Sequence, residues 1–228
     1  MRILLVGYGR MGRMVERLAP EYGAEIAGAV DIDSASSLRE GDWGHVDVAL
    51  DFSSPDAVPA NVPALAKRGI NIVVGTTGWS AQEADVRKAV DAGGIGVVVA
   101  PNFSTGVVLF EAIVAEASRL FASQPEFGAW LHEAHHNQKK DAPSGTALML
   151  KRAMERSGYA LPLDVSSTRA GHDPGTHTIG FDGPAESITL SHSARDRSAF
   201  ARGALAAAKW IQGKRGWFTM HDVLGLNR

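Results

Sequence analysis

The sequence predicts an α/β protein with an N-terminal parallel-sheet domain and a C-terminal α+β domain built on an open sheet. Two observations support this fold class. In the N-terminal part, short and almost uninterrupted apolar runs alternate with helical segments, as in a parallel sheet covered on both faces. From residue 104 onward, helices and strands follow an order typical of an open sheet. We expect the first domain to cover residues 1–103, completed by about residues 198–228, and the second to cover residues 104–197.

The first domain is expected to contain five buried strands with helices between them. The strands are the apolar runs at residues 3–6, 26–30, 46–51, 70–74 and 95–99, and the first and last helices end near residues 18 and 91. Between the third and fourth strands, Ser54 resembles an N-cap, Pro55 a first-turn proline and Asp56 an acid favoured by the helix dipole. Pro59 and Pro63 are expected to make that helix irregular, because proline lacks the N–H group that an interior position donates.

The rest of the chain is expected to alternate long helices with shorter strands. The elements are a helix at residues 104–121, a strand at 127–134, a helix at 144–157, strands at 178–180 and 187–192, and a helix at 198–211. Ser144 is expected to cap its helix and Gly158 to end it. Two prolines and two glycines fall in residues 159–176, so we expect this segment to form loops.

The composition is ordinary for a globular protein and excludes several function classes. The chain is 45% hydrophobic and 21% charged, and its net charge of −2 provides no positive field for nucleic acids or anionic membranes. The absence of cysteine excludes disulfides, thiolate metal sites and cysteine nucleophiles. No apolar stretch is long enough for a membrane span, and the run at residues 3–6 is too short for a signal peptide. We therefore expect a cytoplasmic protein that handles small molecules.

A glycine-rich turn follows the first strand and opens the first helix. It has the spacing Gly7-x-Gly9-x-x-Gly12, and Asp31, at the end of the second strand, follows Gly12 by 19 residues. This combination indicates a Rossmann-type dinucleotide site, in which the glycines permit a tight turn and close approach of the pyrophosphate, and the acid binds the ribose. A glycine turn without a ligand is the less favoured alternative. The expected cofactor-binding residues here are Gly7, Tyr8, Gly9, Arg10, Met11, Gly12 and Asp31.

The residues after the second strand favour NADH over NADPH. Asp31 is followed by Ile32 and Asp33 rather than by arginine, so two acids would repel a 2′-phosphate. Arg10 and Arg39 are cations that could still reach such a phosphate. We therefore expect NADH to be the preferred cofactor, with NADPH as an alternative.

Polar loops also follow the third, fourth and fifth strands. Ligands of parallel sheets bind beyond the carboxyl ends of the strands, so we expect these loops to meet at one sheet edge together with the glycine turn. The residues at this edge are Ser53, Gly75, Thr76, Thr77, Gly78, Ala100, Pro101, Asn102 and Phe103.

The most distinctive segment of the second domain contains His135, His136 and Lys139. A histidine has a pKa near neutrality and can donate a proton at physiological pH, and a lysine offers a second cationic donor. Asp141 is surrounded by cations, so we expect it to orient Lys139 or the following turn rather than to act as a base. These residues predict an acid site.

An anion-binding turn follows directly. Ser144, Gly145 and Thr146 open a helix, so their backbone amides and hydroxyl groups can hold a carboxylate. A proton donor next to a carboxylate site, in a chain with a dinucleotide fingerprint, indicates a reductase that acts on a small carboxylate.

His132, Glu133 and His136 also match the H-E-x-x-H pattern of zinc proteases. That pattern requires a helix, whereas residues 127–134 have the character of a strand, in which Glu133 and His135 would share one face. No third metal ligand is evident, so we expect no metal. A metalloprotease and a set of histidines without function are both disfavoured.

Together these motifs resemble those of the 4-hydroxy-tetrahydrodipicolinate reductase family of lysine and diaminopimelate biosynthesis. The most specific are EAHH at residues 133–136 with Lys139, and DAPSGTA at residues 141–147. The motifs GRMG at residues 9–12, GTTG at 75–78, APNFS at 100–104 and DVLGL at 222–226 also fit. They follow the family order along almost the whole chain.

The resemblance implies reduction of 4-hydroxy-tetrahydrodipicolinate by NAD(P)H to give tetrahydrodipicolinate and water. It implies that His135 is the general acid and Lys139 a second proton donor. It also implies that His136, Gly145 and Thr146 bind the substrate carboxylates.

The same resemblance has implications for the organisation of the protein. It places residues 75–77 and 100–103 around the nicotinamide and Arg197 at a hinge for domain closure. The second domain would bind the substrate and form the oligomer, a cytoplasmic homotetramer built through its sheets. The chain is shorter than most members between Asp31 and Val46 and between Pro174 and Ser187, and its glycine turn is one residue shorter than in many of them.

Two other functions remain open at this point. One is a different dinucleotide enzyme, such as an amino-acid or homoserine-type dehydrogenase, although the His-His-Lys cluster argues against it. The other is a non-catalytic NAD-sensing module, which would bind the cofactor without turnover.

Overall fold

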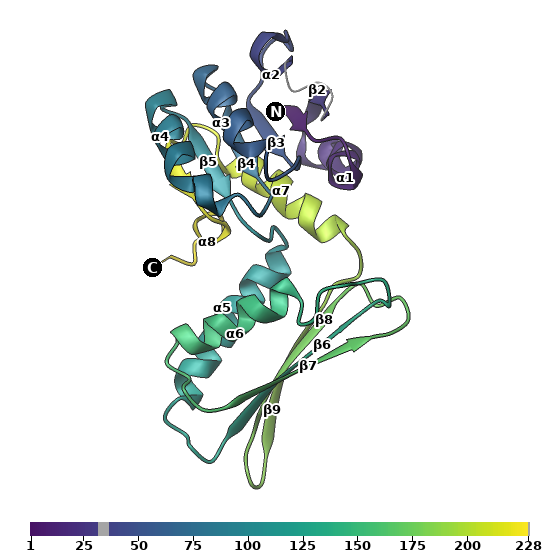
Figure 1. Cartoon of the computed structure of the whole chain (residues 1–228), viewed down its shortest axis with the longest axis vertical. Coiled ribbons are helices and arrows are strands. Elements are labelled where there is room, and N and C mark those ends of the chain that lie inside the picture. The colour runs from purple at the N-terminus through teal and green to yellow at the C-terminus, as the bar shows by residue number, and fades with distance from the viewer. Residues whose placement is uncertain (32–36, 228) are drawn as a thin grey trace. The chain divides into compact units, whose positions relative to one another are not determined.

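The computed structural model describes residues 1–31 and 37–227, and contacts divide the chain into two compact units (Figure 1). Unit 1 comprises Met1–Thr105 and Phe200–Arg228, and unit 2 comprises Gly106–Ala199. In the described part of the chain, no helix has both the length and the apolar character needed to cross a bilayer.

Unit 1 is built on a parallel sheet of six strands. They are β1 (Arg2–Val6), β2 (Glu25–Val30), β3 (Val48–Asp51), β4 (Asn71–Val74), β5 (Gly96–Val99) and β10 (Gly216–Phe218), in the order β10-β5-β4-β3-β1-β2. The predicted parallel sheet is confirmed, but β10 was not expected. It is only three residues long and pairs with β5 alone, which is too little for an apolar pattern to reveal it.

Helices cover both faces of this sheet. They are α1 (Arg10–Leu18), η1 (Ala19–Tyr22), α2 (Ser37–Glu40), α3 (Val58–Lys67), η3 (Ser80–Gln82), α4 (Glu83–Gly93), α7 (Ser198–Trp210) and α8 (Met220–Val223). Strand order reverses between β1 and β3, so right-handed crossovers place α1 on the opposite face from α3 and α4. Such a reversal is where ligands bind in sheets of this kind. The carboxyl ends of β1 and β3 therefore mark the candidate cofactor site.

The start of α3 differs from the expectation. Its N-cap is Ala57, and the backbone oxygen of Ser54 instead accepts a hydrogen bond from the Ala57 amide in the preceding turn. Pro59 lies in the first turn, where its missing N–H group is not needed, and Pro63 is accommodated inside the helix. The helix is continuous from Val58 to Lys67, so the expected irregularity was wrong.

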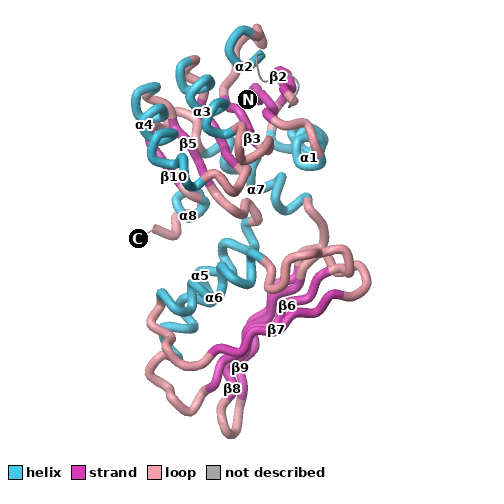
Figure 2. The backbone as a smooth tube through the Cα atoms, viewed as in Figure 1, coloured by secondary structure: helices cyan, strands magenta, loops and turns pink. Residues whose placement is uncertain are grey.

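Unit 2 packs two helices on one face of an open sheet, as Figure 2 shows. The helices are α5 (Thr105–Phe121) and α6 (Gly145–Arg156), and the sheet has the order β7 (Leu163–Arg169), β6 (Gly128–His135), β8 (Thr176–Asp182) and β9 (Ser187–Ser193). Strand β6 is parallel to β7 and antiparallel to β8. The apolar core between the helices and the sheet includes Leu131, Leu150, Met154, Ile179 and Phe181. The predicted α+β unit is confirmed.

Strand β7 lies inside residues 159–176, which were expected to form loops. The breakers of that segment all fall outside Leu163–Arg169. In the edge strand β7, Leu163 and Val165 alternate with polar residues, but Ser167 and Arg169 continue the same face with polar side chains. The apolar alternation is therefore too short to identify the strand.

Candidate functional site

The glycine turn of unit 1 has the geometry of a dinucleotide cradle. Gly7 has φ +92°, and a Cβ there would lie 2.4 Å from the Phe52 oxygen. A Cβ on Gly12 would lie 2.4 Å from the Gly7 oxygen, whereas nothing lies within 4 Å of the Cβ position of Gly9. The first and third glycines thus allow the chain to pack, and the second leaves open space at the N-terminus of α1. A pyrophosphate fits this arrangement, because the first amides of the helix have no side-chain cap.

The residues around the turn are placed as follows. The Tyr8 hydroxyl bonds the Glu16 carboxylate, Arg10 is exposed as the first residue of α1, and Met11 is half-buried. Asp31 is exposed at the end of β2, and the Gly7 amide donates to the backbone oxygen of the preceding Val30. Asp33 and the Arg39 side chain, which were expected to influence the choice between NADH and NADPH, lie outside the described residues.

A buried aspartate ties the loops at this sheet edge together. Asp51 is fully buried at the end of β3, and its Oδ1 accepts hydrogen bonds from the Ser53 hydroxyl (2.7 Å) and the Thr76 hydroxyl (2.8 Å). Its Oδ2 accepts from the amide of buried Asn61 on α3 (2.9 Å). Asp51 therefore fixes the loop after β4 against β3 and α3. The sequence did not predict this role, because in the sequence Asp51 is only the last residue of a buried strand and its partners are distant in the chain.

The loops after β3, β4 and β5 meet around Phe52. A Cβ on Gly75 would lie 2.1 Å from the Phe52 ring, and the Phe103 ring lies 6.2 Å from it in an edge contact. The Asn102 side chain accepts from the Ser104 amide and shapes its own loop. Ala100 and Phe103 are buried, whereas Pro101 and Thr77 are exposed. The structure thus brings the predicted loops to one edge, where Thr77, Gly78 and Pro101 are exposed.

Replacing Asp51 with alanine tests its role as a buried anchor. The change removes the carboxylate that accepts from the Asn61 amide and the Thr76 hydroxyl and leaves each of them only a longer hydrogen bond, so we expect the free energy of unfolding to fall by about 2–3 kcal/mol. Urea denaturation measures this, with Asp56→Ala as the matched control because Asp56 is exposed. Equal stability of the two variants would contradict the anchoring role.

In unit 2, β6 presents its functional residues to the interior. Ala129, Leu131, Glu133 and His135 are buried on the face that packs against the helices, and the residues between them are half-buried on the other face. The predicted strand is confirmed, and with it the shared face of Glu133 and His135. The H-E-x-x-H match therefore has no helix on which to form a zinc site.

Glu133 is the centre of a buried polar cluster. One carboxylate oxygen, Oε2, is hydrogen-bonded to His135 Nδ1 and accepts from Arg169 Nη1 at 3.0 Å. The other, Oε1, accepts from Arg169 Nη2 at 2.6 Å and from the Ser144 amide at 3.3 Å. On β8, His177 lies opposite Glu133, with its Nε2 3.0 Å from the Ser144 hydroxyl and its ring 5.1 Å from that of His135.

The charges of this cluster follow from its contacts. Burial acts to raise the pKa of Glu133, but hydrogen bonds from Arg169, Ser167 and His135 outweigh it and lower the pKa to about 2. Burial lowers the pKa of His135, although the Glu133 carboxylate opposes that shift. Burial also lowers the pKa of His177 to about 4, so this ring is neutral at neutral pH. The cluster therefore holds an ionised carboxylate against a guanidinium and an uncharged His177 imidazole, and burial disfavours a charged His135 ring.

Glu133, His135 and His177 place three potential metal-ligand atoms within 4.8 Å of one another. Both oxygens of Glu133 already accept hydrogen bonds from the Arg169 guanidinium. The charge of the carboxylate is thus balanced by the Arg169 guanidinium. The arrangement is better suited to binding a proton on His135 than to binding a metal ion.

The segment after β6 carries the other predicted residues. Lys139 Nζ lies 2.8 and 3.0 Å from the two oxygens of Asp141, and this contact holds the pKa of Asp141 below its usual range. The His136 backbone amide donates to the backbone oxygen of Asp173 at 2.8 Å. The expectation that Asp141 orients Lys139 agrees with this pairing.

Ser144 is the N-cap of α6, as predicted, and its hydroxyl accepts from the Ala147 amide at 3.1 Å. That hydroxyl is buried and also forms a hydrogen bond with His177, so both of its contacts are with the protein itself. Gly145 is exposed with nothing within 4 Å of its Cβ position, and Thr146 is half-exposed. The open part of this helix terminus is therefore at Gly145 and Thr146.

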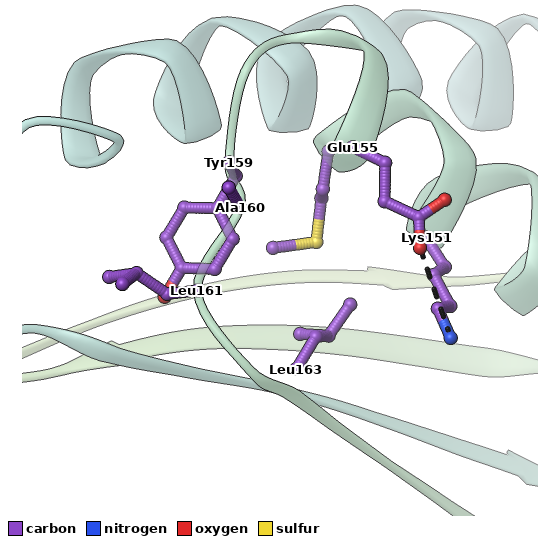
Figure 3. A pocket seen from close by; sticks show the side chains of 7 residues that line it. Lys151, Glu155, Tyr159, Ala160, Leu161 and Leu163 are labelled. Carbon is purple, nitrogen blue, oxygen red and sulfur yellow. Dashed lines mark ion pairs between the residues drawn. The ribbon is translucent and has the colours of Figure 1, made fainter.

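A small pocket elsewhere in unit 2 contains none of these residues (Figure 3). It is lined by Lys151, Met154, Glu155, Tyr159, Ala160, Leu161 and Leu163. Its only charged groups, Lys151 and Glu155, pair with each other at 3.9 Å. Nothing in its lining suggests catalysis.

Arg169 and His177 were missed by the sequence analysis. Both depend on strand register, since His135 pairs with Arg169 on β7 and Glu133 with His177 on β8. Glu133 could have been found, because a carboxylate two residues before the proposed acid shares its face in a strand.

The chain matches two family models that together cover most of its length. Residues 1–103 match the model described as dihydrodipicolinate reductase, N-terminus, and residues 106–224 the model described as dihydrodipicolinate reductase, C-terminus. A 4-hydroxy-tetrahydrodipicolinate reductase from Bradyrhizobium diazoefficiens is 38% identical, over 99% of this chain and 98% of the relative. One of the same name from Christiangramia forsetii is 33% identical over 98% of both chains.

Solved structures agree on the fold. The dipicolinate-bound dihydrodipicolinate reductase from Paenisporosarcina sp. TG-14 superposes with a TM-score of 0.81 at 21% identity, covering 96% of this chain and 97% of that one. A probable dehydrogenase from Thermotoga maritima superposes with a TM-score of 0.58 at 11% identity, covering 98% and 92%.

Proposed function

The chain belongs to the dihydrodipicolinate reductase family, and from this premise we propose that it reduces 4-hydroxy-tetrahydrodipicolinate. The reaction consumes the substrate, NAD(P)H and a proton, and yields tetrahydrodipicolinate, NAD(P)⁺ and water, a step of diaminopimelate and lysine biosynthesis. The observation that carries this proposal is the position of His135, which is paired with a buried carboxylate on the strand that leads to Lys139 and the α6 N-terminus.

The bound nicotinamide supplies the hydride, and the residues of the chain supply the proton and the binding contacts. His135 is assigned as the general acid, because an imidazolium donates a proton effectively near neutral pH. Lys139 is assigned as the second donor and electrostatic contact for the dianionic substrate. The exposed Gly145 and the half-exposed Thr146 at the α6 N-terminus, together with His136, are assigned to the substrate carboxylates. Ser144 is assigned to holding this turn through its cap.

The cofactor residues assigned in unit 1 are those of the glycine turn and of the loops around Phe52. Amides at the N-terminus of α1 are assigned to the pyrophosphate, and the open space at Gly9 supports this. The exposed Thr77 and Pro101 are assigned to the nicotinamide end, with Thr76, Ala100, Asn102 and Phe103 shaping that part of the site.

The test is an absorbance assay with enzymatically generated 4-hydroxy-tetrahydrodipicolinate. Oxidation of NAD(P)H that depends on this substrate would support the proposal. A panel of amino acids, homoserine included, with NAD(P)⁺ tests the rival dehydrogenases. Cofactor binding without turnover of any substrate would instead indicate a sensor.

We expect NADH to be preferred over NADPH by on the order of tenfold in kcat/KM, because the exposed Asp31 repels a 2′-phosphate. Initial rates with both cofactors measure this. Asp31→Ser is expected to narrow the difference by weakening NADH and relieving the repulsion of NADPH. Comparable efficiency of the unaltered protein with both cofactors would contradict the preference.

We also propose that the protein is a homotetramer formed through the sheets of unit 2, as its resemblance to the family implies. Exposed Ile188 on β9 offers apolar surface on that sheet. Light scattering after size-exclusion chromatography tests this, and a monomeric mass across the concentrations of the assay would contradict it.

A further inference from the structure

The two ring nitrogens of His135 have different surroundings. Nδ1 is hydrogen-bonded to Glu133, whereas Nε2 faces Gly175, where an added Cβ would lie only 2.9 Å away. Gly175 has φ +145°, which side-chain-bearing residues rarely adopt, so both backbone conformation and space favour glycine there. Glycine at position 175 therefore leaves Nε2 without a side chain packed against it from that residue.

Glu133 determines where the imidazole hydrogens lie. An ionised carboxylate only accepts hydrogen bonds, so Nδ1 of His135 must carry a hydrogen. In the neutral ring, Nε2 is then without one. His135 can therefore donate a proton from Nε2 only after it has taken up a second proton.

The charged groups around the ring differ in their effect on that second proton. Arg169 on β7 and Lys139 after β6 disfavour a charged ring, and burial does so as well. His177 on β8 adds no negative charge, and His192 on β9 lies beyond it, near His177. Of the described groups that face His135, Glu133 is the one that favours the imidazolium.

Arg169 in turn holds Glu133 in place. Its guanidinium contacts both carboxylate oxygens, and it also donates to the backbone oxygens of Asp141 (2.6 Å) and Thr168 (2.8 Å). The guanidinium is therefore fixed by β7 and by the loop before α6. A bidentate pair of this kind fixes the orientation of a carboxylate as well as its charge.

We propose that Glu133, held by Arg169, is the positioning residue of His135: it fixes Nδ1–H, presents Nε2 and supplies the negative charge that lets the ring take up its catalytic proton. The inference rests on the proposed function only in that His135 is the acid there. Glu133 itself touches neither substrate nor cofactor in this account.

The test is Glu133→Gln, which keeps the shape of the side chain and removes its charge. Because Arg169 Nη2 and the Ser144 amide only donate, the glutamine oxygen is expected to take the Oε1 position that faces them. Its NH₂ group then takes the Oε2 position, which faces His135 Nδ1 and also Arg169 Nη1. Nδ1 must then accept, so the neutral ring should switch to the Nε2–H form. Ring ¹⁵N shifts in histidine-labelled protein report both this switch and the titration midpoint of His135.

We expect the midpoint in the variant to fall by about one pH unit or more. The corresponding limb of the kcat/KM profile should move to lower pH, and kcat at neutral pH should fall by about 10–100-fold with a smaller change in KM. Glu133→Asp keeps the charge and should retain the Nδ1–H form. An unchanged midpoint and unchanged ring shifts in Glu133→Gln would overturn the proposal.

A second variant and a titration without substrate allow the result to be interpreted in every case. If Glu133→Gln fails to fold with Arg169 unpaired, the double variant Glu133→Gln/Arg169→Met removes both charges. Its midpoint is expected to lie below that of the unaltered protein but to fall less than in Glu133→Gln, because Arg169 also disfavours the charged ring. The NMR titration needs no substrate. Failure of the unaltered protein to turn over the substrate would therefore count against the proposed function, and a tautomer insensitive to Glu133→Gln against the present inference.

Discussion

Replacement of His135 with glutamine is expected to lower kcat by about 10²–10⁴, because glutamine has no proton to donate near neutral pH. The side chain of His135 is buried beside Glu133, so glutamine can still fill much of its space and accept or donate hydrogen bonds. Cofactor binding in unit 1 should be unaffected, which fluorescence titration with NADH can check. Steady-state kinetics over a range of pH measures the loss.

His132→Gln provides the matched control for that experiment. His132 lies on the opposite face of the same strand, where it is hydrogen-bonded to the Ser166 hydroxyl at 2.9 Å. We expect this variant to retain nearly full activity. Full turnover by His135→Gln, or equal losses in the two variants, would show that the acid is another residue.

Replacement of Arg169 with methionine is expected to lower the free energy of unfolding by about 3–5 kcal/mol at neutral pH, because it leaves the Glu133 carboxylate buried without its cation. Methionine retains much of the apolar stem, so the change mainly removes charge. Urea denaturation measures the difference. Arg119→Met serves as control, because the ion pair of Arg119 with Glu116 is exposed and should contribute little.

The stability difference between the unaltered protein and Arg169→Met is expected to depend on pH. The pKa of Glu133 in the folded protein is about 2, below its ordinary value of 4.5. The stability that its ionised form contributes is therefore complete above about pH 4.5 and is lost as the pH falls toward 2. In Arg169→Met the buried carboxylate should take up a proton at higher pH, so the stability difference should narrow on acidification. A difference that is small at pH 7, or that widens toward pH 4, would contradict the assigned role of Arg169.

The sequence was sufficient for features set by local pattern. The apolar runs of β1 and β3–β5 identify buried parallel strands, and Ser144 is recognisable as a cap from the residues that follow it. The alternation in β6 likewise places Glu133 and His135 on one face. Each of these depends on a few neighbouring residues.

Features set by partners distant in the chain could not be predicted. Arg169 becomes part of the site only through the pairing of β7 with β6, and β7 itself is too polar to be identified as a strand. Asp51 likewise depends on Asn61 and Thr76, which come from a helix and a loop. Ser54 shows the opposite error, because a local capping pattern was present and the chain used Ala57 instead.

The measurement that tests the central claim most directly is transfer of deuterium from [4-²H]-labelled NADH to 4-hydroxy-tetrahydrodipicolinate. Both C4 epimers of the labelled cofactor should be used, so that either face of the nicotinamide is sampled. The product is analysed by mass spectrometry. The account predicts tetrahydrodipicolinate carrying one deuterium with one epimer and none with the other. Oxidation of NADH without deuterium in the product from either epimer, or no turnover by protein that binds NADH, would contradict it.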